Sequence, residues 1–312
     1  MNTEVTMMKV GVLALALAGV ATGQDLFRSD PPSLGGILFP HLHANAAVGD
    51  STRDPADLAA HAHDPNDQFT LQGIDLGASL RYGEYLRGFA NYRVFRDLDD
   101  DWDGEWEEAF AKLDNLPGGF ELRGGRLLNR VGRQNAVHLH GWDFVDANLI
   151  TSRMLGEEGL RTNSGEITWN LPVPLHSALS VSFGDAVSHD QHGHGGDHGD
   201  DHDDDHDEGD DDDHDDDDHG GIEGEEAGFD TNVITGRLDV LWGYNDFHQF
   251  RFGGSVVTGD NMFGRTTTAG GMDVEYLWRE NGLEEGGRSL RWLTEIMARE
   301  VEYVDEDSGR RG

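Results

Sequence analysis

The chain has 312 residues, with 23 Lys and Arg against 61 Asp and Glu, so its formal net charge is −38. It contains no Cys, which excludes disulfide scaffolds, Cys-ligated zinc, iron–sulfur clusters and thiol catalysis. A chain this acidic repels the phosphates of nucleic acid, so we exclude nucleic acid as a partner and expect cations instead.

The first residues predict an export signal. Lys9 is followed by an apolar run from Val10 to Val20, and small residues precede Gln24. This order is typical of a signal peptide, here residues 1–23. An N-terminal membrane anchor is the alternative, but the run is short for a span of about 20 residues. No later stretch is apolar enough for a transmembrane helix, so we expect an exported protein.

Residues 24–67 are rich in Pro, Asp, Ala and His, and we interpret them as an irregular N-terminal segment that contains His. From residue 68 the chain alternates: Ile74, Leu76 and Leu80 project one way, while Asp75 and Ser79 project the other. A period of two is typical of strands with one apolar and one polar face. We predict about ten strands between residues 69 and 304, within a domain of residues 68–312.

The connections between these strands alternate in length. Tight turns are predicted at 115–119, 171–174 and 243–246, and long connections near 128–161, 185–229 and 259–267. A soluble β-sandwich would bury the apolar face in a core. A transmembrane β-barrel would turn that face to lipid, with short turns at one end and long loops at the other.

We favour an all-β antiparallel transmembrane barrel over the sandwich for three reasons. The strands are long, aromatic residues gather near their ends as they do in interface girdles, and charges lie on the polar face, where a packed core would not tolerate them. The aromatic residues are Trp106, Phe110, Trp242, Tyr244, Phe247, Trp278 and Trp292. The charged residues are Arg81, Arg123, Arg237, Asp239, Asp273, Glu275 and Arg279. Because the last strand is followed by loop-like residues up to Gly312, we expect the barrel to be incomplete at its C-terminus.

Four motifs resemble a family of porin-like outer-membrane proteins that are often described as zinc-regulated or TonB-dependent outer-membrane receptors. They span 116–126 (LPGGFELRGGR), 132–135 (GRQN), 138–146 (HLHGWDFVD) and 155–160 (LGEEGL), and the close match covers about 106–172. The resemblance implies a Gram-negative outer-membrane barrel for uptake, with a metal as the expected cargo. We find no plug domain before the first predicted strand, so the chain is expected to be a plain porin-like channel rather than an energised TonB-dependent receptor.

The sequence from 189 to 219 contains 16 Asp, one Glu and eight His and accounts for −17 of the net charge. Neutral imidazole and carboxylate are ligands for Zn²⁺, Ni²⁺ or Cu²⁺. Without a fixed spacing, this composition predicts several weak, exchanging metal sites in an external loop spanning 185–229. A disordered acidic loop that only solvates the surface is the alternative. The candidate ligands are His189, His192, His194, His198, His202, His206, His214 and His219.

His-x-His pairs form a second pattern, because residues i and i+2 of an extended segment project from the same face. His138 and His140, together with Asp143, are a candidate metal site; alternatively, this segment folds inward as a constriction loop. The pairs at 41/43 and 61/63 are weaker candidates. The adjacent Glu107 and Glu108 are expected on opposite faces of a strand. We find no catalytic motif and expect no enzyme activity and no required cofactor.

We therefore expect a porin-like channel for small solutes in the outer membrane of a Gram-negative bacterium. An external loop that binds zinc or a similar ion weakly would concentrate divalent cations as cargo. The expected partners are outer-membrane lipid and divalent cations, with a homo-oligomer as a further possibility. Two alternatives stay open: a non-transporting, barrel-anchored protein that sequesters metal, and a soluble exported β-sandwich that buffers metal.

Overall fold

The computed structural model describes residues 33–49, 68–96, 102–138, 141, 149–156, 159–187, 228–284 and 286–303. These residues are almost entirely β-structure, and their one named helix is α2 (Leu149–Leu155). The strands are β1 (Leu38–Gly49), β2 (Gln68–Tyr82), β3 (Leu86–Arg96), β4 (Trp102–Leu116), β5 (Phe120–Leu128), β6 (Arg161–Asn170), β7 (His176–Ala186), β8 (Val233–Asn245), β9 (His248–Asp260), β10 (Thr266–Arg279) and β11 (Ser289–Val301).

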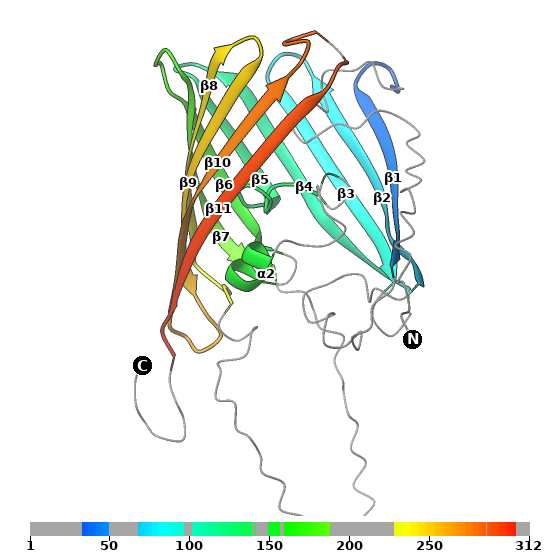
Figure 1. Cartoon of the computed structure of the whole chain (residues 1–312). Helices are drawn as coiled ribbons and strands as arrows, with labels where there is room; N and C mark the ends of the chain where they lie inside the picture. The colour runs from blue at the N-terminus through cyan, green and yellow to red at the C-terminus, as the bar shows by residue number, and fades with distance from the viewer. Residues whose placement is uncertain are drawn as a thin grey trace, which may run out of the picture.

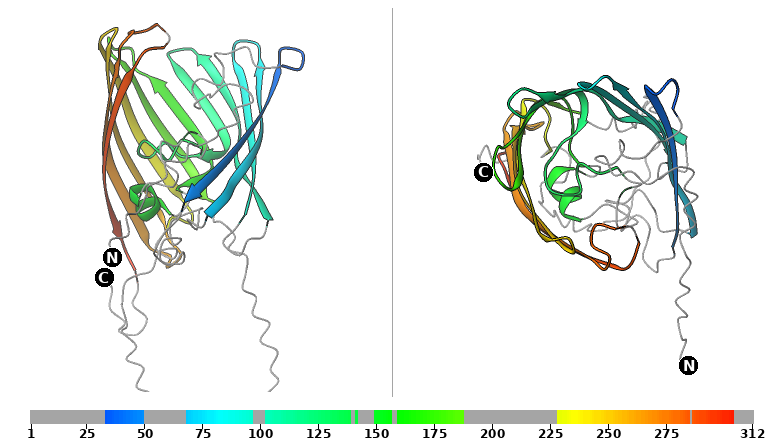
Figure 2. Two further views of the ribbon diagram at one scale, coloured as in Figure 1. Left: turned by 45° about the vertical axis from the view of Figure 1, so that its right-hand side comes forward. Right: turned by 90° about the horizontal axis from the view of Figure 1, so that it is seen from above.

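All eleven strands form one sheet in which each strand pairs antiparallel with its neighbours in the sequence. The sheet curls strongly, and α2 lies within its curve (Figures 1 and 2). β1 and β11 are the two edges and are not hydrogen-bonded to each other in the described ladder. The all-β antiparallel prediction is thus confirmed, in the form of an open sheet. Within the described residues, no helix is long and apolar enough to cross a membrane.

The two faces of the sheet have inverted polarity compared with a water-soluble protein. On the outer, convex face, Leu76 is 49% exposed, Ile167 53% and Ile296 70%. On the inner, concave face, Asp75 is 1% exposed and Asp273 2%. Among the described residues, the buried polar and charged side chains outnumber the buried hydrophobic ones. The alternation therefore sends apolar side chains out and polar side chains in.

The predicted short turns lie at one end of the strands, the upper end in Figure 1, and the long β5–β6 and β7–β8 connections lie at the other end. That other end also has two connections of five residues, 97–101 and 261–265, so the prediction of a long connection at 259–267 is wrong. The predicted turn at 115–119 joins β4 to β5 and has positive φ at Asn115, Gly118 and Gly119. A Cβ at Gly119 would lie only 2.8 Å from the carbonyl oxygen of Asn170, so glycine is needed there for space as well as for φ.

The prediction of an irregular segment at 24–67 is wrong for residues 38–49, which form β1. The expected count of about ten strands holds for β2 to β11, and β1 adds one more. The alternation of apolar and polar residues was not recognised in β1, because the segment contains Pro40 and the polar residues His41, His43 and Asn45. Pro is tolerated because β1 is an edge strand, and the polar residues face the polar concave side opposite β2.

Candidate functional site: the charged inner face and the segment that crosses it

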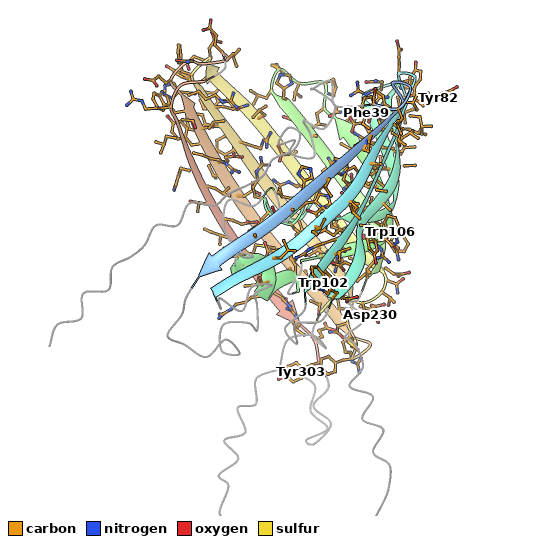
Figure 3. The ribbon with its side chains drawn as sticks, turned by 90° about the vertical axis from the view of Figure 1, so that its right-hand side faces the viewer. Phe39, Tyr82, Trp102, Trp106, Asp230 and Tyr303 are labelled. Atoms are coloured by element: carbon orange, nitrogen blue, oxygen red, sulfur yellow. The ribbon has the colours of Figure 1, made fainter. Side chains whose placement is uncertain are left out.

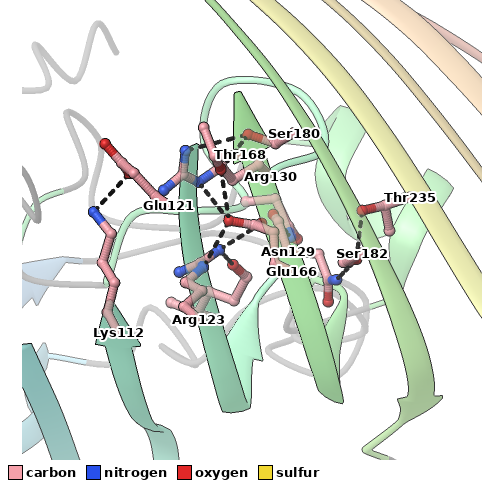
Figure 4. Close-up of polar contacts among 12 residues, drawn as sticks. Lys112, Glu121, Arg123, Asn129, Arg130, Glu166, Thr168, Ser180, Ser182 and Thr235 are labelled. Carbon is pink, nitrogen blue, oxygen red and sulfur yellow. Dashed lines mark hydrogen bonds and ion pairs between the residues drawn. The ribbon is translucent and has the colours of Figure 1, made fainter. Parts of the chain in front are cut away.

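Arginines and carboxylates on neighbouring strands form ion pairs on the inner face. Arg123 of β5 donates to both carboxylate oxygens of Glu166 on β6 at 2.9 and 3.0 Å (Figure 4). Arg123 also pairs with Glu108 of β4 at 3.3 Å. Thr168 donates to Glu166 and exchanges a 2.9 Å hydrogen bond with Ser180. The acceptor oxygens of Glu166 are thus well satisfied despite burial, as a buried charge requires.

A second group of ion pairs covers the inner face of β8 to β11. Arg237 donates to both oxygens of Asp273 at 2.8 and 3.1 Å and to Asp239 at 3.0 Å. Arg251 pairs with Asp239 at 3.5 Å, and Arg291 donates to Glu275 at 2.6 Å. The prediction that Arg237, Asp239, Asp273 and Glu275 share the polar face is confirmed by these contacts.

Glu107 and Glu108 both point inward, which corrects the expectation that they lie on opposite faces. The register between β3 and β4 shifts after Asn91: Asn91 pairs with Glu108, while Tyr92 pairs with Trp106. Glu107 is therefore the extra residue of a β-bulge, and a bulge re-aims a side chain that strict alternation would send outward. Both carboxylates are buried.

His138 is buried between these two carboxylates. Its Nδ1 lies 2.9 Å from Oε2 of Glu107, and its Nε2 lies 3.1 Å from Oε2 of Glu108. A carboxylate only accepts hydrogen bonds, so two such partners require a proton on both ring nitrogens, and His138 is an imidazolium. Burial opposes this charge, but the hydrogen bonds to Glu107 and Glu108 outweigh it and raise the pKa of His138, which belongs to the β5–β6 connection.

The segment that carries His138, residues 129–138, crosses the inside of the sheet, and we call it the strap. Near its start, Asn129 donates to Ser182 of β7 at 3.1 Å, and Arg130 pairs with Glu166 of β6 at 3.5 Å (Figure 4). Asn135 folds the strap against the end of the same connection, because its side chain exchanges hydrogen bonds of 3.0 and 2.7 Å with the backbone of Leu160.

The middle of the strap contacts the wall formed by β8 to β11. Val131 is fully buried in a small hydrophobic cluster with Val233, Val257 and Ala269. The backbone N–H of Gly132 donates to Ser255 at 3.0 Å. These contacts show that the strap is packed into the interior and does not merely lie over its mouth.

Arg133 contacts three strands of this wall. Its guanidinium pairs with Glu275 of β10 at 2.8 Å and with Asp239 of β8 at 3.5 Å, and its backbone N–H donates to Glu295 of β11 at 3.0 Å. The strap then reaches the opposite wall, where the His138 ring lies 5.5 Å from the ring of Phe89 on β3. It therefore connects both walls of the curved sheet.

Of the eleven residues predicted to ligate metal at 138–143 and 189–219, the structure describes only His138. His138 lies in the interior with carboxylates at both ring nitrogens, whereas His140 and Asp143 lie outside the described residues. His189, His192, His194, His198, His202, His206, His214 and His219 also lie outside the described residues. In the part of the chain that is described, no three or more His, Asp or Glu side chains are arranged to hold a metal ion. Metal binding by the His/Asp segment stays a prediction.

The pair at 41/43 projects from one face of β1, as its spacing predicted. The ring centroids of His41 and His43 are 5.7 Å apart, and His41 stacks on Phe89 at 5.5 Å. Both lie on the inner face, because they pair with Gly77 and Asp75 of β2. The pair at 61/63 lies outside the described residues.

Most of the predicted girdle aromatics are exposed: Trp106, Trp242, Tyr244, Phe247 and Trp292 are between 42% and 67% exposed. Phe110 differs, because its ring lies 5.8 Å from Phe89 and beneath the guanidinium of Arg123 on the inner face. Tyr82 lies at the short-turn end and Trp102 towards the other end (Figure 3), so exposed aromatic side chains occur near both ends of the strands.

The comparisons with known proteins do not assign a family. No family model matches the chain, and no solved structure matches it. The chain is 37% identical over 75 residues to an uncharacterized protein of Aquifex aeolicus (strain VF5). That stretch is 24% of this chain and 16% of the relative, so the chain covers only a small part of that relative's length. The resemblance to porin-like receptors remains a prediction.

Proposed function

We propose that this chain forms the wall of an outer-membrane β-barrel channel for small solutes, with divalent cations as the favoured cargo. The observation that carries the proposal is the inverted polarity of the sheet. A soluble protein rarely exposes a continuous apolar surface of this extent, whereas lipid-facing residues alternate with polar lumen-facing residues along every strand of a transmembrane barrel.

The dimensions and the ends of the strands agree with this proposal. A strand of 13 residues, such as β8, is about 44 Å long at ~3.4 Å per residue. Tilted by about 40°, it would span ~34 Å, enough for an apolar band of ~25 Å with an interface on each side. Exposed aromatics at both ends match interfacial girdles (Figure 3). The short turns would face the periplasm and the long connections the exterior.

The His/Asp segment, residues 189–219, supports divalent cations as the transported solute. It belongs to the connection between Ala186 and Val233, which is at the long-connection end and thus external in this orientation. Asp side chains there would raise the local cation concentration, and His would favour borderline metals such as Zn²⁺.

Planar-bilayer recording of the purified chain tests the channel. We expect unitary conductance steps that Zn²⁺ modulates. A matched variant with the eight His of 189–219 replaced by Asn should keep the conductance and lose the Zn²⁺ effect, because the acidic charge is retained. If neither protein conducts at any voltage, transport is refuted.

A second function is favoured by the strap, which fills part of the interior with paired charges. In this alternative the barrel only anchors a surface protein that sequesters metal. It predicts no conductance, but Zn²⁺ retention by reconstituted vesicles that is lost in the His-to-Asn variant.

A further inference from the structure

The strap differs in charge from the wall that it contacts. Residues 129–138 carry three positive side chains, Arg130, Arg133 and protonated His138, and no acidic one. Each of the three lies against a carboxylate of the wall: Glu166, Glu275 or the bulge pair Glu107 and Glu108. The strap therefore supplies positive charge to an interior that is already ionic.

Among the described residues, the wall has an excess of acid in the ion-pair network that the strap joins. Its carboxylates belong to Glu107, Glu108, Glu166, Asp239, Asp273, Glu275 and Glu295. Its guanidinium groups belong to Arg93, Arg123, Arg237, Arg251 and Arg291. The wall thus has two more carboxylates than guanidinium groups, a net charge of −2 in this network. The three positive charges of the strap change that net charge to +1.

We infer that the strap is a tethered counter-cation that sets the charge selectivity of the interior. With the strap in place, the acids of the wall are occupied and a mobile cation finds few free partners. With the strap neutralised or withdrawn, the same acids attract cations. This inference rests on the proposed channel and adds to it the residues that govern which ions pass.

The two halves of the strap are held differently, which determines where it could move. In the first half, hydrophobic packing of Val131 and a backbone hydrogen bond from Gly132 to the β8–β11 wall add to the ion pairs of Arg130 and Arg133. At the other end, His138 is held at the β4 wall by ion pairs, and ion pairs weaken when a competing ion binds the carboxylates. The His138 end is therefore the part that a permeating cation can displace.

The test neutralises the strap without removing its bulk. In a salt gradient across a planar bilayer, the reversal potential gives the permeability ratio of cation to anion. We expect this ratio to rise severalfold from the wild type to Arg130→Gln/Arg133→Gln/His138→Gln, because uncompensated carboxylates attract cations. Arg288→Gln is the matched control: it removes one positive charge from the exposed β10–β11 turn, where Arg288 pairs only with Glu280 among its described contacts.

A second measurement does not need a channel. Free Mn²⁺, counted by electron paramagnetic resonance during titration of the refolded protein, should show at least one additional bound ion per chain in the triple variant relative to wild type and Arg288→Gln. Extra Mn²⁺ without conductance in any protein would support the strap as the counter-cation of the interior carboxylates, but would refute the channel and with it any role in selecting permeating ions.

Unchanged ion binding together with an unchanged permeability ratio would overturn the inference and leave the channel intact. If the triple variant does not refold, Arg130→Gln alone is used. The Arg130 side chain is 30% exposed, so its loss is tolerated best, and it should shift both readouts in the same direction by a smaller amount.

Discussion

The substitution Leu238→Arg tests directly whether lipid covers the outer face of the sheet. Leu238 lies near the middle of β8 and is 43% exposed. If that exposed fraction is in lipid, losing it costs about 1 kcal/mol, since full burial of Leu is worth roughly 1.5–3 kcal/mol. Arg near the midplane of a bilayer adds about 2–4 kcal/mol. We therefore expect Leu238→Arg to make folding into vesicles less favourable by about 3–5 kcal/mol.

Leu283→Arg is the matched control, because Leu283 is 77% exposed in the β10–β11 turn, outside the apolar band. Its cost should be about 0–1 kcal/mol. Both variants and the wild type would be titrated with denaturant in the presence of phospholipid vesicles, and the folded fraction followed by tryptophan fluorescence. A difference between the two variants below about 0.5 kcal/mol, the usual range for a water-exposed site, would refute lipid contact at β8.

Three further predictions concern the strap and the His/Asp segment. His138→Gln leaves Glu107 and Glu108 without their shared cation and should cost about 3–5 kcal/mol in a denaturant titration at pH 6. Because the pKa of His138 is raised in the folded state, its contribution is complete below the ordinary histidine pKa of about 6.5 and is lost as the pH rises through the folded pKa. The gap between wild type and variant should thus narrow above neutral pH, and a gap that widens would contradict the assigned charge. Gly132→Ala should destabilise more than Gly264→Ala: both have positive φ, costing about 1–2 kcal/mol, but only the Cβ at 132 would collide with Glu295. Equal denaturation midpoints of the two variants would show that Glu295 moves away from the new Cβ without a loss of stability. A peptide of residues 186–228 should bind Zn²⁺ with micromolar or weaker affinity and release it near about pH 5, as its His become protonated; no calorimetric heat beyond that of an all-Asp peptide would refute metal capture.

Most of the fold could be predicted from the strict alternation of apolar and polar residues along the strands. It placed Asp75 and Ser79 on one face and Leu76 and Leu80 on the other, and the structure confirms both assignments. Side-chain period is a local property of the chain, so a single sequence contains it. β1 was missed because its inward residues are His and Asn rather than charged residues, and because Pro40 suggested a loop.

The site could be predicted only in part, because its contacts are not local. The bulge at Glu107 is a mismatch between two strands and has no signature within β4 alone. Arg133 and Asp239 are 106 residues apart in the sequence and meet only because the connection turns inward. The charge-rich inner face was predicted from composition, but the pairing of its members required the register of the sheet.

The two edges of the sheet that the described residues form have a consequence for how such a wall can close. Strand direction reverses at every step of the sheet, so the first and the eleventh strands run the same way. If these two strands met, the ring would contain one parallel pair, whose slanted hydrogen bonds are slightly weaker than the antiparallel ones elsewhere. A ring of strictly alternating direction needs an even number of members, so it would require one strand, or another odd number, between β11 and β1.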